Sequence, residues 1–151
     1  MTELERKISK MSKEEKRELR RAYYQGYGEE SIRKQIFVFM SKAAHKGDLE
    51  SIIFMGHVYT AGIGVEKDAE IAHNWYLKAA KKNDAGALVA VGDYHYHKKE
   101  YELAHNWYID ATKAGKKTAY IRLSMIYKLG LGVEKDLEKA LNYKNLAMKK
   151  D

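Results

Sequence analysis

The residues of this 151-residue chain whose types and spacing could support metal binding or proton transfer are histidines and one neighbouring aspartate. Asp93, His95 and His97 lie close together, while His73 and His105 occur in two identical pentapeptides. Imidazole and carboxylate groups bind Zn²⁺ or transfer protons. Residues two apart diverge around a helix, so only Asp93 and His97, four apart, could face one another, and two ligands are too few for a metal. We expect no metal or other cofactor, and a metal-dependent enzyme remains only a third alternative.

Other catalytic patterns are missing from the sequence. None of the serines lies in a nucleophile-elbow context, and the absence of cysteine excludes disulfides, thiolate metal sites and thiol catalysis. The segment Gly62-Ile63-Gly64 lacks the Gly-Lys-Ser/Thr of a phosphate loop and recurs later in the chain, which indicates a turn between helices. We therefore predict that the protein is not an enzyme.

An internal repeat organises the chain. The pentapeptide Ala-His-Asn-Trp-Tyr occurs at residues 72–76 and again at 104–108, and residues 55–68 align with 123–136. The copy between them lacks the Gly-x-Gly-Val segment and is four residues shorter. Such self-similarity is typical of stacked structural units. The predicted units are residues 12–47, 48–83, 84–115 and 116–151.

Within each unit, apolar residues recur at helical spacing. In the second unit one stripe runs from Ile52 through Met55 to Tyr59, and another includes Ala72 and Trp75. Each unit is therefore predicted to be a pair of antiparallel helices, in which small residues at the contact ridge let the helices approach.

Helix start and stop signals agree with these units. Ser12 and Glu15 fit a capping box, in which each side chain accepts a hydrogen bond from the other residue's backbone amide. Gly47, Asn83 and Gly115 stand where the second helices should end, and both residue types tolerate the left-handed conformation common there.

These motifs carry a family resemblance. Leu/Met-Gly-x-x-Tyr, Gly-x-Gly-Val-x-x-Asp, Ala-x-x-Trp and Lys-Ala-Ala resemble the Sel-one-like repeat, a relative of the tetratricopeptide repeat, over nearly the whole chain. The first copy departs most, with Lys16 and Arg20 where the family places packing residues. The resemblance implies an all-α fold, a right-handed alpha-alpha superhelix (solenoid) of about four tetratricopeptide-like hairpins. It also implies a concave face, lined by the first helices, that binds a protein or peptide.

Composition favours one soluble domain spanning residues 1–151, because 45% hydrophobic and 32% charged residues are ordinary values and no proline or Ser/Gly-rich run marks a linker. Repeat arrays need polar ends. Polar residues dominate the first and last helices, which predicts a finished array: Lys13, Lys16, Arg17 and Arg20 at one end, and Lys139, Asn142, Lys144, Asn145 and Lys149 at the other. The N-terminus forms no apolar stretch, so we expect neither signal peptide nor membrane span and a cytoplasmic location.

The net charge of +7 and a pI near 9.3 favour an acidic partner. A nucleic-acid-associated regulator that uses this basic surface is the alternative function. The basic and acidic side chains of the first residues are interleaved, however, which is more typical of a solvated, ion-paired helix face.

Candidate partner-binding residues follow from carrying the groove positions of the resembled family onto the first helices. They are Arg17, Arg21, Tyr24, Glu50, Ile53, His57, Val89, Asp93, Tyr96, His97, Ile121, Met125 and Lys128. An apolar floor with aromatic and charged edges suits a peptide that has apolar anchors and acidic character. For Val89 and Ile121, packing between helices is an equal alternative. The predicted function is a non-catalytic protein-interaction module, in one version a bacterial immunity or adaptor protein.

Overall fold

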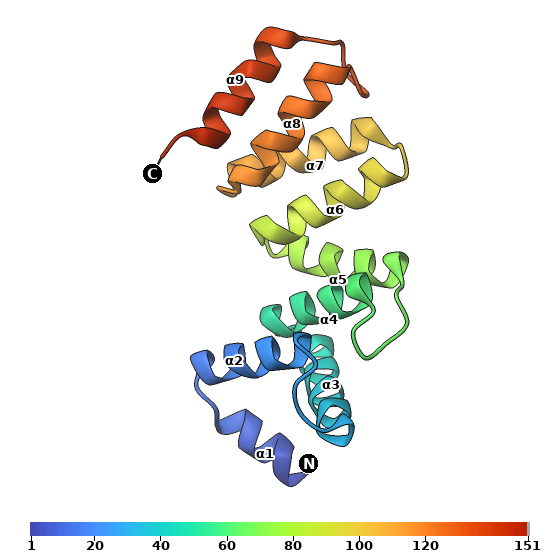
Figure 1. The fold of residues 1–151 in the computed structure, drawn as a ribbon, viewed down its shortest axis with the longest axis vertical. Helices are drawn as coiled ribbons and strands as arrows, with labels where there is room; N and C mark the ends of the chain where they lie inside the picture. Colours follow the sequence, from blue (N-terminus) through green and yellow to red (C-terminus); the bar gives the residue numbers. More distant parts are fainter. Residues whose placement is uncertain (151) are drawn as a thin grey trace. The chain divides into compact units, whose positions relative to one another are not determined.

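The structure, a computed structural model, describes residues 1–150, and within this range it is built of α-helices alone (Figure 1). The helices are α1 (Glu3–Lys10), α2 (Lys13–Tyr24), α3 (Glu30–His45), α4 (Leu49–Ala61), α5 (Ala69–Lys81), α6 (Ala85–His97), α7 (Tyr101–Lys113), α8 (Lys117–Leu129) and α9 (Leu137–Met148). Helices α2 to α9 form four sequential hairpins. The all-α hairpin architecture is therefore confirmed.

The chain divides into two compact units, Met1–Trp75 and a second from Tyr76 onward. The boundary falls inside the continuous helix α5 rather than at a linker. A single repeat domain over residues 1–151 stays a prediction, and each unit is described below by itself.

The predicted helix ends are confirmed. Ser12 and Glu15 form the reciprocal capping box at the start of α2. Gly47, Asn83 and Gly115 all adopt left-handed backbone conformations, with φ of 90°, 60° and 85°. Local turn chemistry therefore sets the limits of the repeats.

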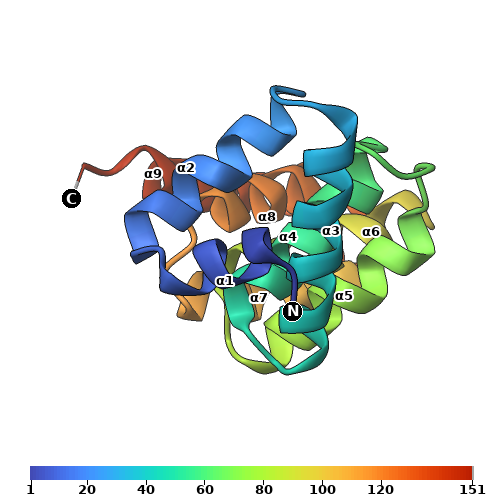
Figure 2. The same cartoon turned by 90° about the horizontal axis from the view of Figure 1, so that it is seen from below.

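Helix α1 precedes the first hairpin and was not predicted. It has its own capping box, between Thr2 and Glu5, and it packs against α3, as Figure 2 shows from below. Ile8 is completely buried, and Glu5 accepts a hydrogen bond from Lys42 Nζ at 2.8 Å. This bond, followed by that from the Thr2 amide, holds the pKa of Glu5 below its ordinary value of 4.5. Helix α1 thus covers α3 in the first unit.

The long loops of the second and fourth repeats have matching geometry. Backbone hydrogen bonds from Asp68 N to Tyr59 O (2.9 Å) and from Asp136 N to Tyr127 O (3.0 Å) close them. The short loop of the third repeat turns instead at Lys99, a non-glycine residue with φ of 61°. The glycine pairs of the long loops are therefore turn residues, as predicted.

Close helix contact through small residues is confirmed in the second unit. A Cβ atom added to Gly92 of α6 would lie 2.5 Å from Cε1 of Tyr108 on α7, and Tyr108 is completely buried. Gly92 therefore gives the tyrosine ring the space to pack against α6.

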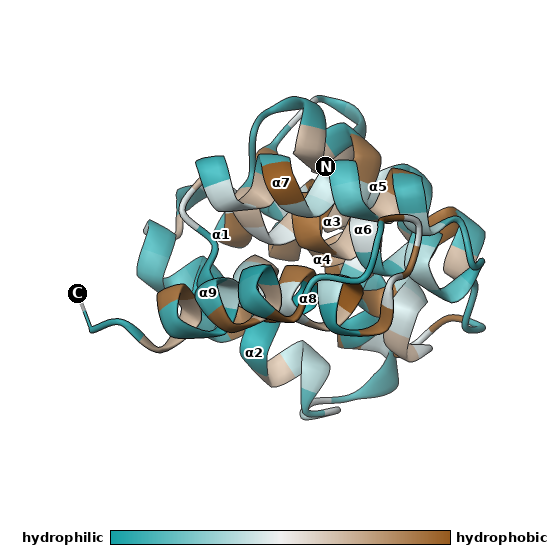
Figure 3. Cartoon of the chain, turned by 90° about the horizontal axis from the view of Figure 1, so that it is seen from above, coloured by the Kyte–Doolittle hydropathy of each residue, from teal (hydrophilic) through white to brown (hydrophobic). Residues whose placement is uncertain are grey.

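The prediction that the last helix is polar over most of its circumference is wrong on one side. Helix α9 exposes Leu137, Leu141, Leu146 and Met148, each by more than 40% (Figure 3). The polar residues were identified correctly, but the leucines between them are exposed as well. Among the described residues of α9, only Ala140 is fully buried. No helix in residues 1–150 has the length and apolar character needed to cross a membrane.

Candidate protein-binding site

Aromatic side chains meet on the first helices of the first unit. The Tyr24 ring on α2 stacks on Phe54 of α4, with centroids 5.5 Å apart and planes inclined by 30°. His57, one turn further along α4, meets the edge of Tyr24 at 5.9 Å. Phe54 is fully buried whereas Tyr24 is half-buried and His57 exposed. The predicted site residues Tyr24 and His57 are thus brought together over an aromatic base.

Two arginines extend this cluster along α2. Arg17 and Arg21 are both exposed, and the one ion pair of Arg17, with Glu14, spans 3.8 Å. Within residues 1–150, Arg21 makes neither an ion pair nor a side-chain hydrogen bond. Such weakly held guanidinium groups remain available for a carboxylate.

Glu50, also a predicted site residue, is engaged by the protein itself. Arg20 Nη2 lies 2.5 Å from its Oε2, and Lys13 Nζ lies 3.4 Å from its Oε1. The Arg20 side chain is only 14% exposed. Glu50 therefore joins α4 to α2, and Ile53 on the next turn of α4 is half-buried.

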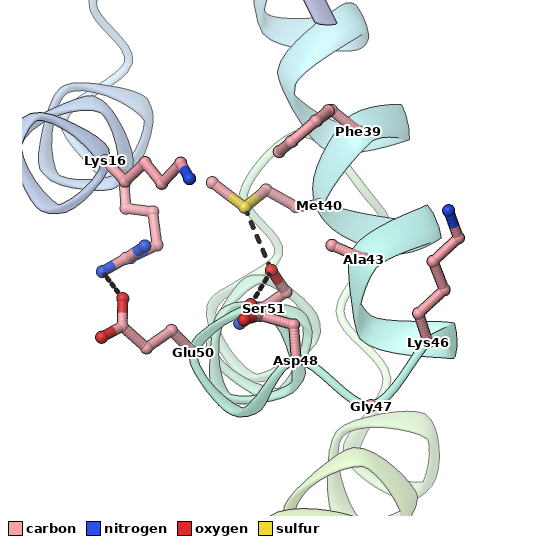
Figure 4. A pocket seen from close by; sticks show the side chains of 10 residues that line it. Lys16, Phe39, Met40, Ala43, Lys46, Gly47, Asp48, Glu50 and Ser51 are labelled. Carbon is pink, nitrogen blue, oxygen red and sulfur yellow. Dashed lines mark hydrogen bonds and ion pairs between the residues drawn. The ribbon is translucent and has the colours of Figure 1, made fainter. Parts of the chain in front are cut away.

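A cavity of about 460 Å³ opens beside this ion pair between α2, α3 and α4 (Figure 4). Its lining combines an apolar wall with charged groups: Lys16, Arg20, Phe39, Met40, Ala43, Lys46, Gly47, Asp48, Glu50 and Ser51. The Ser51 hydroxyl donates to Asp48 at 2.5 Å and lies 3.5 Å from Met40 Sδ. The cavity can thus accept an apolar side chain on its Phe39 and Met40 side, with the Lys16 ammonium opposite.

In the second unit, the predicted site residue Asp93 is also bound by side chains of the protein itself. Asp93 of α6 accepts a hydrogen bond from the Tyr108 hydroxyl at 2.7 Å, and Arg122 of α8 donates to both its oxygens, from Nε at 2.8 Å and from Nη2 at 3.2 Å. Burial, followed by the hydrogen bond to Asp93, raises the pKa of Tyr108 above its ordinary value of 10, and the hydrogen bond to Asp93 raises that of Arg122. Asp93 therefore joins three helices, and its side chain remains 29% exposed.

The other predicted residues of the second unit differ in accessibility. Val89 is only 8% exposed, so helix packing, the alternative left open from the sequence, takes up most of its surface. Ile121 is 53% exposed, Met125 is half-buried and Lys128 is exposed. Tyr96 packs edge-on against Tyr101 at 5.4 Å. The complete partner-binding set stays a prediction.

The histidines are occupied by local contacts. His97 Nδ1 lies 2.6 Å from the backbone oxygen of Asp93 rather than from its carboxylate, and His95 Nδ1 lies 2.7 Å from Glu100. His105 Nε2 lies 3.0 Å from the Tyr127 hydroxyl. In the part of the chain that the structure describes, no three His, Cys, Asp or Glu side chains gather as metal ligands would.

Phe54, Tyr108 and Arg122 were missed from the sequence because their partners lie on other helices. Arg20 could have been noticed from the sequence, because the equivalent positions of the second and third repeats hold glycines, Gly56 and Gly92.

Comparison with known proteins finds one matching family model and a partly similar yeast protein. The sequence model of the Sel1 repeat matches residues 49–84 and 117–147, which form the hairpins α4–α5 and α8–α9. Protein SHC1 of Saccharomyces cerevisiae is 33% identical over 76 residues, half of this chain and 15% of that protein.

Two solved structures have similar folds. A Sel1 repeat protein from Oxalobacter formigenes is 30% identical, with a TM-score of 0.74 over 87% of this chain and 55% of its own. The protein c5321, a protective antigen of uropathogenic Escherichia coli strains with an SLR fold, is 27% identical, with a TM-score of 0.74 over 85% of this chain and 28% of its own. The chain thus spans little more than half the length of the Oxalobacter protein, just over a quarter of c5321 and far less of SHC1.

Proposed function

Because this chain is a Sel1 repeat protein, of a family whose repeats generally mediate protein binding, we propose that it is a non-catalytic module that binds one partner along its first helices. The observation that carries the proposal is the aromatic cluster of Tyr24, Phe54 and His57. Buried aromatic bases with half-exposed tyrosines and adjacent arginines are typical of the residues that dominate binding energy at protein interfaces. An adaptor or an immunity protein would use such a face.

The partner's chemistry follows from the charges around this cluster. Arg17 and Arg21 are exposed and weakly held, whereas Glu50 is neutralised by Arg20. The face therefore presents positive charge next to apolar rings. We expect an acidic segment with an apolar or aromatic anchor, which would enter the cavity beside Met40.

Pull-down from a lysate of the source cell, followed by mass spectrometry at moderate and at high salt, tests the proposal. The test variant carries Arg21→Ala and Tyr24→Ala. The matched control carries Arg6→Ala and Tyr27→Ala, an equal loss of charge and ring at exposed positions away from the cluster. Circular dichroism checks that helicity is unchanged in both.

A defined protein that is retained at both salt concentrations, lost by the test variant and kept by the control supports the proposal. Retention of nucleic acid alone, with steep salt dependence and equal behaviour of both variants, contradicts it and favours the nucleic-acid-associated alternative.

A further inference from the structure

Helix α9 presents an apolar stripe that nothing in residues 1–150 covers. Leu137, Leu141 and Met148 are exposed by 61%, 56% and 72%, and their spacing of four and seven residues places them on one face, here called the α9 stripe. Lone exposed leucines are ordinary, but an aligned set on one helix face marks an interaction site.

The internal repeat shows what such a face receives. The Ala-x-x-Trp motif of α7 aligns with Ala140-x-x-Tyr143 of α9, so that Leu141 corresponds to His105 and Met148 to Thr112. On α7 these two positions are half-buried, because α7 packs against the next first helix, α8. His105 Nε2 lies 3.0 Å from the Tyr127 hydroxyl of α8. The α9 stripe is therefore the equivalent of a surface that binds a helix in the same unit.

The residues that differ between α7 and α9 define the occupant's apolar side. A tyrosine hydroxyl placed as in α8 would find Leu141 instead of a histidine and would lose its hydrogen-bonding partner. Met148 in place of Thr112 adds a flexible apolar side chain, which adapts to varied partners. The helix that docks here must therefore present aliphatic side chains at one-turn intervals.

The charges around the α9 stripe indicate which side chains should border the apolar side of the docked helix. On the exposed side of α9 and at residues 149 and 150, the charged side chains are Lys144, Lys149, Lys150 and one acid, Glu138, whereas Lys139 lies over the Tyr127 ring of α8, 4.9 Å from its centroid. A second copy packed on this face would bring lysines near lysines, which opposes association, whereas acidic side chains would be attracted.

We propose that the α9 stripe docks an amphipathic α-helix of another protein, with an aliphatic stripe bordered by acidic side chains. The helix packs on α9 as α8 packs on α7. This surface is separate from the aromatic cluster of the proposed function and does not depend on it.

Two synthetic helical peptides of about 18 residues test the proposal. Both carry leucine at i, i+4, i+7 and i+11; the flanking positions hold glutamate in one and lysine in the other. Each is titrated into the ¹⁵N-labelled full chain, and amide shifts are followed by NMR. We expect the acidic peptide to bind with shifts confined to α9 and the adjacent α8, and the basic peptide to bind at least about tenfold more weakly.

Leu141→Ser is the test variant and Leu129→Ser its matched control, because both leucines are 56% exposed in the second unit. Leu141→Ser should weaken binding of the acidic peptide about tenfold and Leu129→Ser should leave it unchanged. Equal effects of the two variants, equal binding of the two peptides, or no shift on α9 would overturn the proposal. Sedimentation velocity of the protein alone adds one more outcome: a dimer abolished by Leu141→Ser assigns the stripe to a second copy and likewise overturns it.

Discussion

The first and third repeats fill three equivalent register positions with different side chains. In the third repeat they hold Gly92, Asp93 and Tyr108, and in the first they hold Arg20, Arg21 and Met40. In the third repeat the glycine admits the tyrosine ring, and the ring's hydroxyl reaches the aspartate that also binds Arg122.

In the first repeat the same positions leave an open arrangement. Arg20 turns to Glu50, Met40 forms one wall of a cavity of about 460 Å³, and Arg21 stays exposed. One backbone scaffold thus supports a closed polar network in one unit and a hollow, charged face in the other. We therefore expect the third repeat to contribute more to stability and the first to hold the accessible binding groups, and each prediction below tests this division.

The largest effect is expected at Asp93. Asp93→Ala leaves the buried Tyr108 hydroxyl without its acceptor and removes the partner of the partly exposed Arg122, so we expect a loss of about 3 kcal/mol in the free energy of unfolding. Arg21→Ala, at the equivalent position, should change it by less than about 0.5 kcal/mol. Urea denaturation followed by circular dichroism measures both, and losses of similar size would refute the division.

Gly92→Ala comes next. Its new Cβ would lie 2.5 Å from a ring carbon of Tyr108, and the overpacking should cost about 2 kcal/mol despite the better helix propensity of alanine. Arg20→Ala loses one partly screened ion pair and should cost about 1 kcal/mol. Thermal unfolding provides the comparison, and an unchanged or raised Tm in Gly92→Ala would show that Tyr108 moves away freely.

Alkaline pH should separate the two arrangements further. The pKa of Tyr108 is raised in the folded state, so its stabilisation is fully present below pH 10 and is lost as the pH rises above that value, where the unfolded chain ionises first. Tyr108→Phe should lower the alkaline slope of unfolding free energy by up to about 1.4 kcal/mol per pH unit. Denaturation series at several pH values above 10 measure the slope; an identical slope in both proteins would mean that Tyr108 ionises in the folded state. Met40, its counterpart, has no proton to lose.

A small effect on stability is expected at the aromatic cluster. Tyr24→Ala removes a ring stacked on Phe54 and should cost about 1 kcal/mol in unfolding free energy, while it abolishes partner retention. Urea denaturation alongside the pull-down separates the two quantities. A stability loss as large as that of Asp93→Ala would make Tyr24 a core residue rather than a binding residue.

The hairpins and their ends could be predicted from the sequence because their causes are local. Ser12 and Glu15 are three residues apart, and Gly47 needs only its own backbone conformation to end α3. The sequence also contains the capping box of Thr2 and Glu5, which is a start signal for α1. Helix α1 was not predicted because no repeat unit matches this segment.

The side-chain networks could not be predicted in this way. Asp93 and Arg122 are 29 residues apart, and their contact depends on how two first helices are placed, which a repeat pattern leaves undefined. The same pattern identified Glu50 as a groove residue, although Arg20 binds it from the neighbouring helix. Periodicity therefore identified which positions face one another but not which charges neutralise each other there.

Helix α1 also has a consequence for the order of folding. The bond between Glu5 and Lys42 spans 37 residues, so α1 docks only once α3 has formed. Attached by few contacts, it should also be among the first elements to detach in the folded protein, exposing its amides to hydrogen exchange well before those of α6 and α7. The contact between α1 and α3 thus forms late in folding and should open early in the folded protein.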